Sequence, residues 1–388
     1  MEKPKIRFLK NKHSWVRSTF EEIAKRRTKS SDNPDLPRIE YQDILSGEGR
    51  LNKELSNNID CRKGIVFETN DILYGKLRPY LKNWLHPNFN GIALGDFWVL
   101  QARNCDSKFL FSLVQSPKFQ RVANDTSGTK MPRSDWKTVS QTEFSIPASN
   151  DEQSAIGSLF RTLDSLLESY KDNLTNYQSL KVSMLSKMFP KAGQRVPEIR
   201  LDGFEGDWKE MTLGSLGSVA MNKRIFKDET SENGDIPFYK IGTFGGTADA
   251  FISKEKFKEY KEKYPYPEIG DILISASGSI GRTVVYNGED AYYQDSNIVW
   301  LKHDQQLDNS YLQQYYGIIK WSGIEGTTIK RLYNKNILET NIFLPPSVSE
   351  QQAIGTYFSN LDNLINSHQE KISQLETLKK KLLQDMFI

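Results

Sequence analysis

The sequence predicts an α+β protein with two similar halves, each combining a mixed domain of β-sheet and helices with one long helix. The first observation is an internal repeat: residues 143–190 align without a gap on residues 341–388, and 17 of the 48 aligned pairs are identical. The second is that apolar residues in both copies recur at alternating steps of four and three, which is typical of a coiled coil. We therefore expect two similar domains related by pseudo-two-fold symmetry, each followed by one long helix.

The first mixed domain is expected to cover residues 1–150. Short apolar runs at 72–74, 97–100 and 145–146 predict strands, and residues 108–122 predict a helix. The domain has 25 Lys and Arg against 17 Asp and Glu, a net charge of +8. Such an excess of positive charge is typical of proteins that bind phosphate groups.

The two long helices are expected at residues 151–190 and 347–388. Pro190 ends the first, because proline lacks the amide hydrogen that a helix needs. We expect apolar stripes of the two helices to pack on each other. The stripe residues are Ile156, Phe160, Leu163, Leu167 and Leu174 in the first helix, and Ile354, Phe358, Leu361, Ile365, Ile372 and Leu375 in the second. Lys181 and Lys379 interrupt the stripes at matching positions of the repeat.

The second mixed domain is expected at residues 191–346, of which 191–207 form a linker. Strands are predicted at 272–274, 283–286, 297–301 and 342–344, and a helix at 309–321. Residues 197–346 contain 17 Lys and Arg against 22 Asp and Glu, a net charge of −5. If this domain binds a polyanion, it must use a local basic patch or the help of a partner.

The composition argues against several classes of protein. No run of 18 or more apolar residues occurs, and residues 1–12 are basic without an apolar core, so neither a membrane span nor a secretory signal is expected. Cys61 and Cys105 form no Cys-x-x-Cys pair, and a reducing cytoplasm is the expected compartment.

The sequence contains no recognisable catalytic motif. The four histidines, His13, His86, His303 and His368, form no His-x-x-x-His pair, so no metal site is expected. No phosphate-binding loop occurs, and we interpret the glycine-rich residues 278–281 as a turn. The Asn-Pro-Pro-aromatic motif with which amino-methyltransferases hold an extruded base is also missing from the sequence.

Several duplicated motifs resemble those of a known family. Glu-Gln-x-Ala-Ile-Gly occurs at 152–157 and 350–355, and each copy continues into a helix that carries Leu-Asp, at 163–164 and 361–362. In this order they resemble the specificity subunit of Type I restriction-modification enzymes. The Pro-x-Ile-Arg-Phe/Leu segments that open each half and the Gly-Thr-x-Ile/Met-x-Arg segments, at 128–133 and 326–331, are similar to that family too.

The resemblance implies a non-catalytic subunit that reads a split sequence in double-stranded DNA. Residues 1–150 and 191–346 would be two target-recognition domains separated by the two long helices. These helices would pack antiparallel as a coiled coil and set the length of the spacer between the half-sites. Such a subunit recruits two modification subunits, which bind S-adenosylmethionine and methylate adenine. Two translocase-nuclease subunits that use ATP and Mg²⁺ can join them in the bacterial or archaeal cytoplasm. This chain itself is expected to bind no cofactor.

Arg or Lys for guanine and Asn or Gln for adenine are the side chains expected at base edges. The candidates in the first half are Tyr74, Lys76, Arg78, Tyr80, Ser127, Gly128, Thr129, Lys130 and Arg133. Those in the second half are Asn222, Lys223, Arg224, Lys240, Ser275, Ser277, Ser279, Arg282, Thr327, Thr328, Lys330 and Arg331. Two alternatives remain open: a helical scaffold that reads no DNA sequence, and a self-contained DNA-modifying enzyme.

Overall fold

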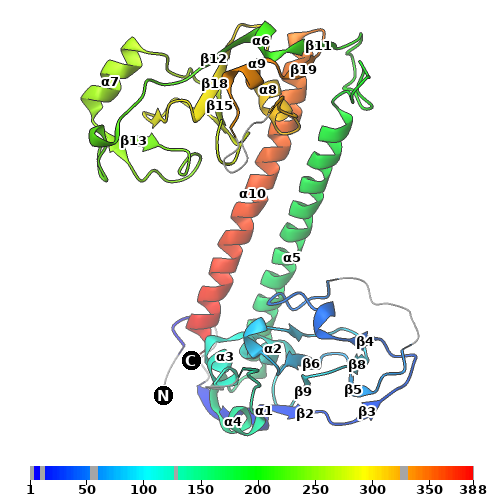
Figure 1. Ribbon diagram of the computed structural model, residues 1–388. Coiled ribbons are helices and arrows are strands. Elements are labelled where there is room, and N and C mark those ends of the chain that lie inside the picture. The colour runs from blue at the N-terminus through cyan, green and yellow to red at the C-terminus, as the bar shows by residue number, and fades with distance from the viewer. Residues whose placement is uncertain (1–3, 9–13, 53–59, 126–129, 324–330, 388) are drawn as a thin grey trace. The chain divides into compact units, whose positions relative to one another are not determined.

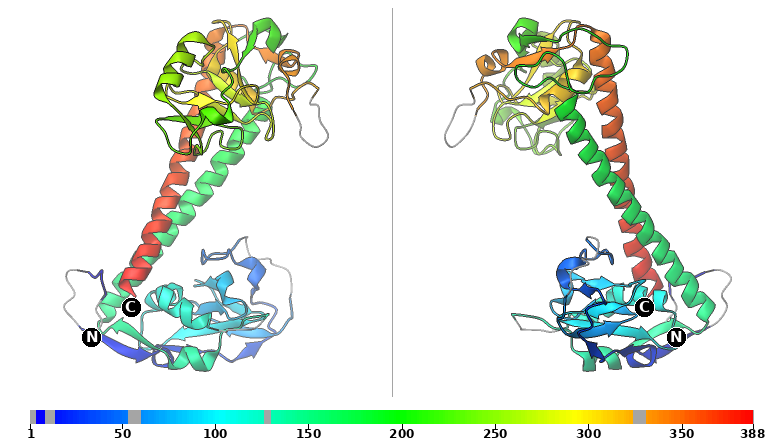
Figure 2. Two further views of the ribbon diagram at one scale, coloured as in Figure 1. Left: turned by 60° about the vertical axis from the view of Figure 1, so that its left-hand side comes forward. Right: turned by 90° about the vertical axis from the view of Figure 1, so that its right-hand side faces the viewer.

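The computed structural model describes residues 4–8, 14–52, 60–125, 130–323 and 331–387 (Figures 1 and 2). The chain divides into two compact units. Unit 1 is Met1–Asn173 together with His368–Ile388, and unit 2 is Leu174–Ser367. Each unit combines mixed sheets and short helices with a portion of both long helices, which confirms the predicted α+β class. Among the described residues, no helix has the length and apolar character that a membrane span requires.

The two long helices are α5 (Asn150–Lys187) and α10 (Val348–Met386), as the repeat predicts. In unit 1 the ammonium group of Lys379 lies 2.6 Å from the carboxylate of Asp164, and that of Lys171 lies 2.8 Å from that of Glu376. The residue number along α10 therefore falls as the number along α5 rises. The two helices run antiparallel in unit 1.

The strands of unit 1 form two four-stranded sheets and one two-stranded pair. They are β1 (Trp15–Thr19), β2 (Ala24–Arg26), β3 (Ser30–Ser31), β4 (Arg38–Ile39), β5 (Gly64–Phe67), β6 (Ile72–Gly75), β7 (Trp84–Leu85), β8 (Gly91–Ala93), β9 (Phe97–Ala102) and β10 (Glu143–Pro147). The first sheet has the antiparallel order β2-β9-β6-β7. The second has the order β3-β5-β8-β4, in which β4 and β8 run parallel. Strand β1 pairs with β10, which leads into α5.

Unit 1 has four short helices among its described residues, and two of them replace the single helix that the sequence predicts at 108–122. They are α1 (Phe20–Ile23), α2 (Ser107–Gln115), α3 (Pro117–Ala123) and α4 (Trp136–Gln141), with 3₁₀ turns η1 (Tyr41–Asp43) and η2 (Pro79–Leu81). The single helix expected at 108–122 is divided, because Pro117 has no amide hydrogen and Ser116 before it is extended, with φ −65° and ψ 150°. The Ser116 hydroxyl instead caps α3 by accepting a hydrogen bond from the amide of Phe119.

The strands of unit 2 repeat the main sheet of unit 1. They are β11 (Lys209–Thr212), β12 (Gly217–Ala220), β13 (Ile236–Tyr239), β14 (Phe251–Ile252), β15 (Ile272–Ser275), β16 (Thr283–Val285), β17 (Tyr292–Tyr293), β18 (Ile298–His303) and β19 (Asn341–Leu344). The antiparallel order β12-β18-β15-β16 corresponds to β2-β9-β6-β7 in unit 1. The β11–β19 pair corresponds to β1–β10. The remaining sheet differs, because it has the three-stranded order β14-β13-β17.

The short helices of unit 2 are α6 (Leu213–Leu216), α7 (Lys254–Lys263), α8 (Asn309–Tyr316) and α9 (Asn334–Leu338), with the 3₁₀ turn η3 (Lys227–Glu229). The helix expected at 309–321 is α8, and it ends five residues early. Gly317 caps it, and its amide donates to the carbonyls of Gln314 and Tyr315.

Candidate nucleic-acid interface

A buried carboxylate fastens the opening segment of each half to the first turn of a long helix. In unit 1 Glu152 is fully buried and accepts two hydrogen bonds from the Arg7 guanidinium, at 2.6 and 2.7 Å, and one from the Trp15 indole at 3.3 Å. Paired hydrogen bonds of this kind are among the stronger polar contacts in proteins. They explain why both halves of the sequence contain an Arg and a Trp in the opening segment and a Glu in the first turn of the long helix.

The same three side chains meet in unit 2. Glu350 accepts two hydrogen bonds from Arg200, both at 2.8 Å, and one from the Trp208 indole at 3.3 Å. We call each set of Arg, Glu and Trp an anchor triad. Because the triads agree to within 0.2 Å, the two halves hold their long helices in the same way.

The glutamine that follows each anchor glutamate orients a second element. Gln153 accepts from the amide of Asp106, the N-cap of α2, at 2.9 Å and donates to the carbonyl of Pro147 at 2.9 Å. Gln351 accepts from the amide of Asp308, the N-cap of α8, at 2.8 Å. The N-termini of α2 and α8 are therefore placed against the long helices.

The glycine of each motif allows this close approach. A Cβ atom on Gly157 would lie 2.5 Å from the backbone nitrogen of Phe109 in α2, closer than side chains pack. A Cβ atom on Gly355 would collide with Ser310 in α8 in the same way. The Glu-Gln-x-Ala-Ile-Gly motif is thus the sequence of a tight junction between each domain and its helix.

The predicted stripe residues are buried to different degrees. Ile156, Phe160, Leu163, Leu167, Ile354, Phe358, Leu361 and Ile365 are buried, whereas Leu174, Ile372 and Leu375 are half-buried. In unit 1 Phe160 shares a core cluster with Met386 of α10 and with Phe109 of α2. In unit 2 Phe358 shares one with Met188 and with residues of the domain. The first turns of each helix therefore pack on the domain core as well as on the other helix, which the stripe alone does not indicate.

The lysines that interrupt the stripes pair across the helices. Lys379 of α10 binds Asp164 of α5 at 2.6 Å and also donates to the buried amide of Gln115 at 2.8 Å. In unit 2 Lys181 of α5 binds Asp362 of α10. Burial raises the pKa of Asp164, although Lys379 opposes this effect. Each interruption of the apolar pattern is therefore an ion pair between the helices.

The two candidate segments of each domain lie side by side. In unit 1 Leu77 forms an antiparallel bridge with Arg133, and the amide of Arg78 donates to the carbonyl of Pro132 at 2.7 Å. In unit 2 Ser277 forms the matching bridge with Arg331. Residues about 55 positions apart in the sequence are thus brought to one surface at the same place in both domains.

The candidates of the first domain separate into exposed and buried residues. Arg78, Tyr80, Lys130 and Arg133 are exposed, and Arg133 lies 2.9 Å from Asp96, which is 3.7 Å from the half-buried Lys76. Tyr74 is a correction: it belongs to strand β6 and is buried, so it is a core residue and not part of a recognition loop. Ser127, Gly128 and Thr129 lie outside the described residues.

Three candidates of the second domain are also corrected. Asn222, Ser275 and Ser277 are buried. The Ser275 hydroxyl accepts from the amide of Arg282 at 3.0 Å and donates to the carbonyl of Ser279. The Ser277 hydroxyl donates to the side chain of Asn297 at 2.7 Å. The two serines hold the turn at 276–282 in place instead of facing a ligand.

The other candidates of the second domain are accessible at least in part. Ser279, Arg282 and Arg331 are exposed in and beside the turn. Lys223 and Arg224 are exposed, with Arg224 3.0 Å from Asp295, and half-buried Lys240 lies 2.8 Å from Asp249. Thr327, Thr328 and Lys330 lie outside the described residues. Sequence reasoning missed Leu81 and Met131, exposed in the bridged segments of the first domain, because apolar residues next to a strand are usually assigned to the core. It also missed the exposed Lys82, which ends the same turn.

An ion network in unit 1 ties a loop of the domain to both long helices. Arg50 binds Glu48 at 2.8 Å and Asp172 of α5 at 2.9 Å. Lys171 of α5 binds Glu48 at 3.1 Å and Glu376 of α10 at 2.8 Å. Burial opposes the ionisation of Glu48, but hydrogen bonds from Arg50 and Lys171 outweigh it and lower the pKa of Glu48.

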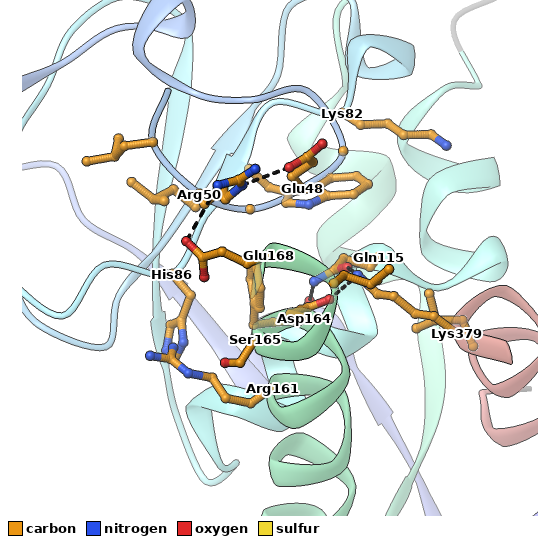
Figure 3. Close-up of a pocket in the computed structure, with 18 of the residues that line it drawn as sticks. Glu48, Arg50, Lys82, His86, Gln115, Arg161, Asp164, Ser165, Glu168 and Lys379 are labelled. Atoms are coloured by element: carbon orange, nitrogen blue, oxygen red, sulfur yellow. Dashed lines mark hydrogen bonds and ion pairs between the residues drawn. The ribbon is translucent and has the colours of Figure 1, made fainter. Parts of the chain in front are cut away.

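The same network borders a cavity of about 720 Å³ in unit 1 (Figure 3). His86 lies in its wall, buried, with its ring stacked on that of Phe111 at 5.3 Å. Neither ring nitrogen of His86 has a hydrogen-bond partner among the described residues. Burial and the positive charge of Arg161, which lies beside it in Figure 3, lower the pKa of His86 to about 4. The ring is therefore neutral at pH 7.

No group of three or more His, Cys, Asp or Glu side chains suited to hold a metal ion occurs within the described ranges. The chemistry on the bridged surfaces is that of hydrogen-bond donors and positive charge. Such groups bind phosphates and the acceptor edges of bases.

Comparisons with known proteins agree with this architecture. Residues 205–377 match the family model of the Type I restriction modification DNA specificity domain. A putative type I restriction enzyme specificity subunit of Haemophilus influenzae is 54% identical over 160 residues, which is 41% of this chain and 41% of that protein. The specificity subunit of a type I restriction enzyme of Methanocaldococcus jannaschii is 23% identical over 350 residues, 83% of this chain and 79% of that protein.

A solved structure has the same fold. The crystal structure of a Type I restriction-modification system S subunit from M. genitalium matches with a TM-score of 0.64 and 16% sequence identity, over 100% of this chain and 99% of that chain. The similarity to the Haemophilus protein, in contrast, spans about two fifths of its length.

Proposed function

We propose that this chain belongs to the family of Type I restriction-modification specificity subunits and that it reads a DNA sequence of two separated half-sites, one with each domain. The observation that carries the proposal is the duplicated bridge, Leu77 with Arg133 and Ser277 with Arg331. It places exposed arginines at equivalent positions of two similar domains. Two equivalent basic surfaces in one chain fit a target with two parts.

The net charges of the two domains suggest that the domains contribute unequally to the free energy of DNA binding. Residues 1–150 have a net charge of +8, and residues 197–346 have one of −5. The first domain is expected to supply most of the salt-dependent attraction to phosphates. The second domain depends on Arg282 and Arg331, which are exposed beside one turn. Its contribution is expected to lie more in base selection than in overall affinity.

The paired helices are proposed to fix the spacer between the half-sites. The anchor triads join each domain rigidly to a helix, and the Lys–Asp pairs join one helix to the other. A length change made equally in both helices should therefore change the spacer that is recognised. A flexible linker would tolerate such a change without altering the spacer.

The partners are proposed from the family. Two modification subunits with S-adenosylmethionine would methylate adenine in the half-sites, and two translocase-nuclease subunits using ATP and Mg²⁺ can complete the complex in the cytoplasm. This chain would supply recognition and no catalytic group. The exposed Leu180, Leu378, Leu166 and Leu364 of the long helices are available to such partners.

Methylation-aware sequencing of a host with and without this gene tests the proposal. The expected result is a bipartite motif with a fixed spacer that is methylated only when the gene is present. Arg78→Ala and Arg331→Ala should each lower methylation of that motif, because each removes one exposed donor from a bridged surface. Arg103→Ala is the matched control, since Arg103 is exposed in the first domain away from the bridge. A chain that binds modification subunits but changes no methylation would instead be a scaffold.

A further inference from the structure

The turn at residues 78–82 of the first domain has a backbone that most side chains avoid. Arg78 and Lys82 both adopt left-handed conformations, with φ of 48° and 55°, on either side of η2. A residue other than glycine in this region is strained and persists only where its surroundings impose it. Here the surroundings do so: Arg78 donates to the carbonyl of Pro132 at 2.7 Å, and Gly47 donates to that of Lys82 at 3.0 Å.

The internal repeat lets us compare the strained Arg78 with the equivalent position of the second domain. The bridging residues Leu77 and Ser277 correspond, so Arg78 corresponds to Gly278. Gly278 has φ 66°, and glycine adopts this conformation at little cost. One fold position thus carries glycine in the second domain and a strained arginine in the first. Because glycine would avoid this strain, the presence of arginine at position 78 indicates that its side chain has a role of its own.

Three exposed apolar side chains belong to the two bridged segments, two in the turn and one in the segment that pairs with it. Tyr80 is 55% exposed, Leu81 39% and Met131 56%. Met131 lies two residues before Arg133, which bridges Leu77. A single exposed apolar residue is ordinary, but three in two paired segments form a candidate contact surface, which we call the apolar tip. In the second domain Tyr80 and Leu81 correspond to Ile280, which is half-buried against the core, and Gly281, and the counterpart of Met131 lies outside the described residues.

Positive charges accompany the apolar tip. Arg78, Lys82 and Lys130 are exposed, and none has an ion pair with a described residue. The nearby Asp96 is already engaged by Lys76 and Arg133. Exposed apolar side chains accompanied by cations that no described acidic residue pairs with complement a polyanion with an apolar interior. Double-stranded DNA has this character, because its phosphates lie outside a stack of flat bases.

We propose that the turn at residues 78–82 is a wedge that enters the DNA of one half-site. Tyr80 and Leu81 would insert between neighbouring base pairs and unstack them, while Arg78, Lys82 and Lys130 bind the flanking phosphates. Architectural proteins use apolar wedges of this kind to bend the duplex. Within the described residues, the corresponding turn of the second domain carries Gly278, half-buried Ile280 and Gly281, so we expect distortion at one half-site only. The inference rests on the proposed function and goes beyond it, since reading a sequence requires no unstacking.

Fluorescence of 2-aminopurine tests the wedge, because this base brightens when it loses its stacking neighbours. The assembled complex with its modification subunits is bound to duplexes of the methylated motif. Each duplex carries one 2-aminopurine at a successive position of either half-site, at bases other than the methylated adenine. The expected result is a rise at one step of one half-site. The double variant Tyr80→Ser/Leu81→Ser should abolish the rise and weaken binding about tenfold, as loss of a stacked aromatic side chain does.

The control variant is Val16→Ser, which removes a side chain that is 41% exposed in strand β1, outside the turn. It should keep both the fluorescence rise and the affinity. Unchanged thermal unfolding of the double variant would show that its loss is not one of folding. Specific binding without any rise, or equal rises in both half-sites that the double variant retains, would overturn the wedge and leave the proposed function intact. Binding without sequence preference would overturn both.

Discussion

The two units share one frame and differ in the surface that the frame presents. Both contain an anchor triad, a glutamine that positions a domain helix, a glycine at the junction and a Lys–Asp pair between the long helices. At the bridged turn, however, unit 1 carries Arg78, Tyr80 and Leu81 where unit 2 carries Gly278, Ile280 and Gly281. The difference shows which parts of the repeat hold the fold and which vary between the two halves.

The anchor triads should give the largest effect and test whether the two frames are equivalent. Glu152→Ala removes a buried carboxylate shared by Arg7 and Trp15, and Glu350→Ala does the same for Arg200 and Trp208. Each variant loses three hydrogen bonds to a charged group, and such a hydrogen bond contributes about 1.5–3 kcal/mol. Urea unfolding should show similar losses for both variants. A large loss for one and none for the other would mean that the frames are not equivalent.

His86 should give a pH dependence that belongs to unit 1 alone. Its folded pKa of about 4 lies below the ordinary value of 6.5, so the unfolded chain binds more protons between these values. The stability that this residue contributes is complete above pH 6.5 and is lost as the pH falls towards 4. Between pH 7.5 and 5.0 the loss should be about 2 kcal/mol.

The variant His86→Phe isolates this effect, because phenylalanine keeps a ring against Phe111 but cannot bind a proton. The free energy of unfolding of the variant should fall less between pH 7.5 and 5.0 than that of the wild type. Equal slopes for the two proteins would contradict the burial of a neutral imidazole at this position.

Alanine substitution of Gly157 and Gly355 compares the junctions of the two units and should change stability less than loss of the anchor glutamates. Alanine normally stabilises a helix relative to glycine, yet Gly157→Ala should destabilise the protein by about 1–3 kcal/mol, because its Cβ atom meets the backbone of α2. Gly355→Ala should behave alike. Gly242→Ala is the control, since a Cβ atom there has nothing within 4 Å. Thermal unfolding measures all three, and a stabilised Gly157→Ala would show that the junction is looser than described.

The smallest effect is expected where the two halves differ. Arg78→Gly gives the first turn the residue of the second and relieves the left-handed strain, so stability should rise by up to about 1 kcal/mol. Binding of the assembled complex to its motif should nevertheless weaken. A variant that is less stable, or that binds as well as the wild type, would show that Arg78 serves the fold.

The sequence alone predicted what depends on local periodicity. The spacing of four and three identified α5 and α10, and short apolar runs identified β6, β15 and β18. It could not assign the roles of the motif residues, because Arg7 and Glu152 lie 145 positions apart and only the fold brings them together. Tyr74 shows the opposite error: a residue next to a basic loop was given the role of the loop, although its strand buries it.

The candidate site was predicted as two segments, but its geometry was not. The local sequence Leu-Arg-Pro-Tyr does not indicate that Arg78 has a positive φ. This conformation is imposed from outside the turn, by the hydrogen bond to the carbonyl of Pro132. Ser275 and Ser277 are hydroxyl residues next to a glycine-rich turn, and only their hydrogen bonds reveal that they hold this turn in place. Local sequence identifies donors and acceptors, whereas the tertiary fold decides which of them face outwards.

The Lys–Asp pairs carry a further consequence. Within each copy of the repeat the lysine follows the aspartate at the same interval, Asp164 with Lys181 and Asp362 with Lys379, yet each residue bonds to its opposite in the other copy. A stretch that bears both members of such a reciprocal contact is complementary to itself, as the faces of a symmetric dimer are. An ancestral gene of half this length would therefore have encoded a helix able to bind its twin, and gene fusion needed only to preserve an affinity already there.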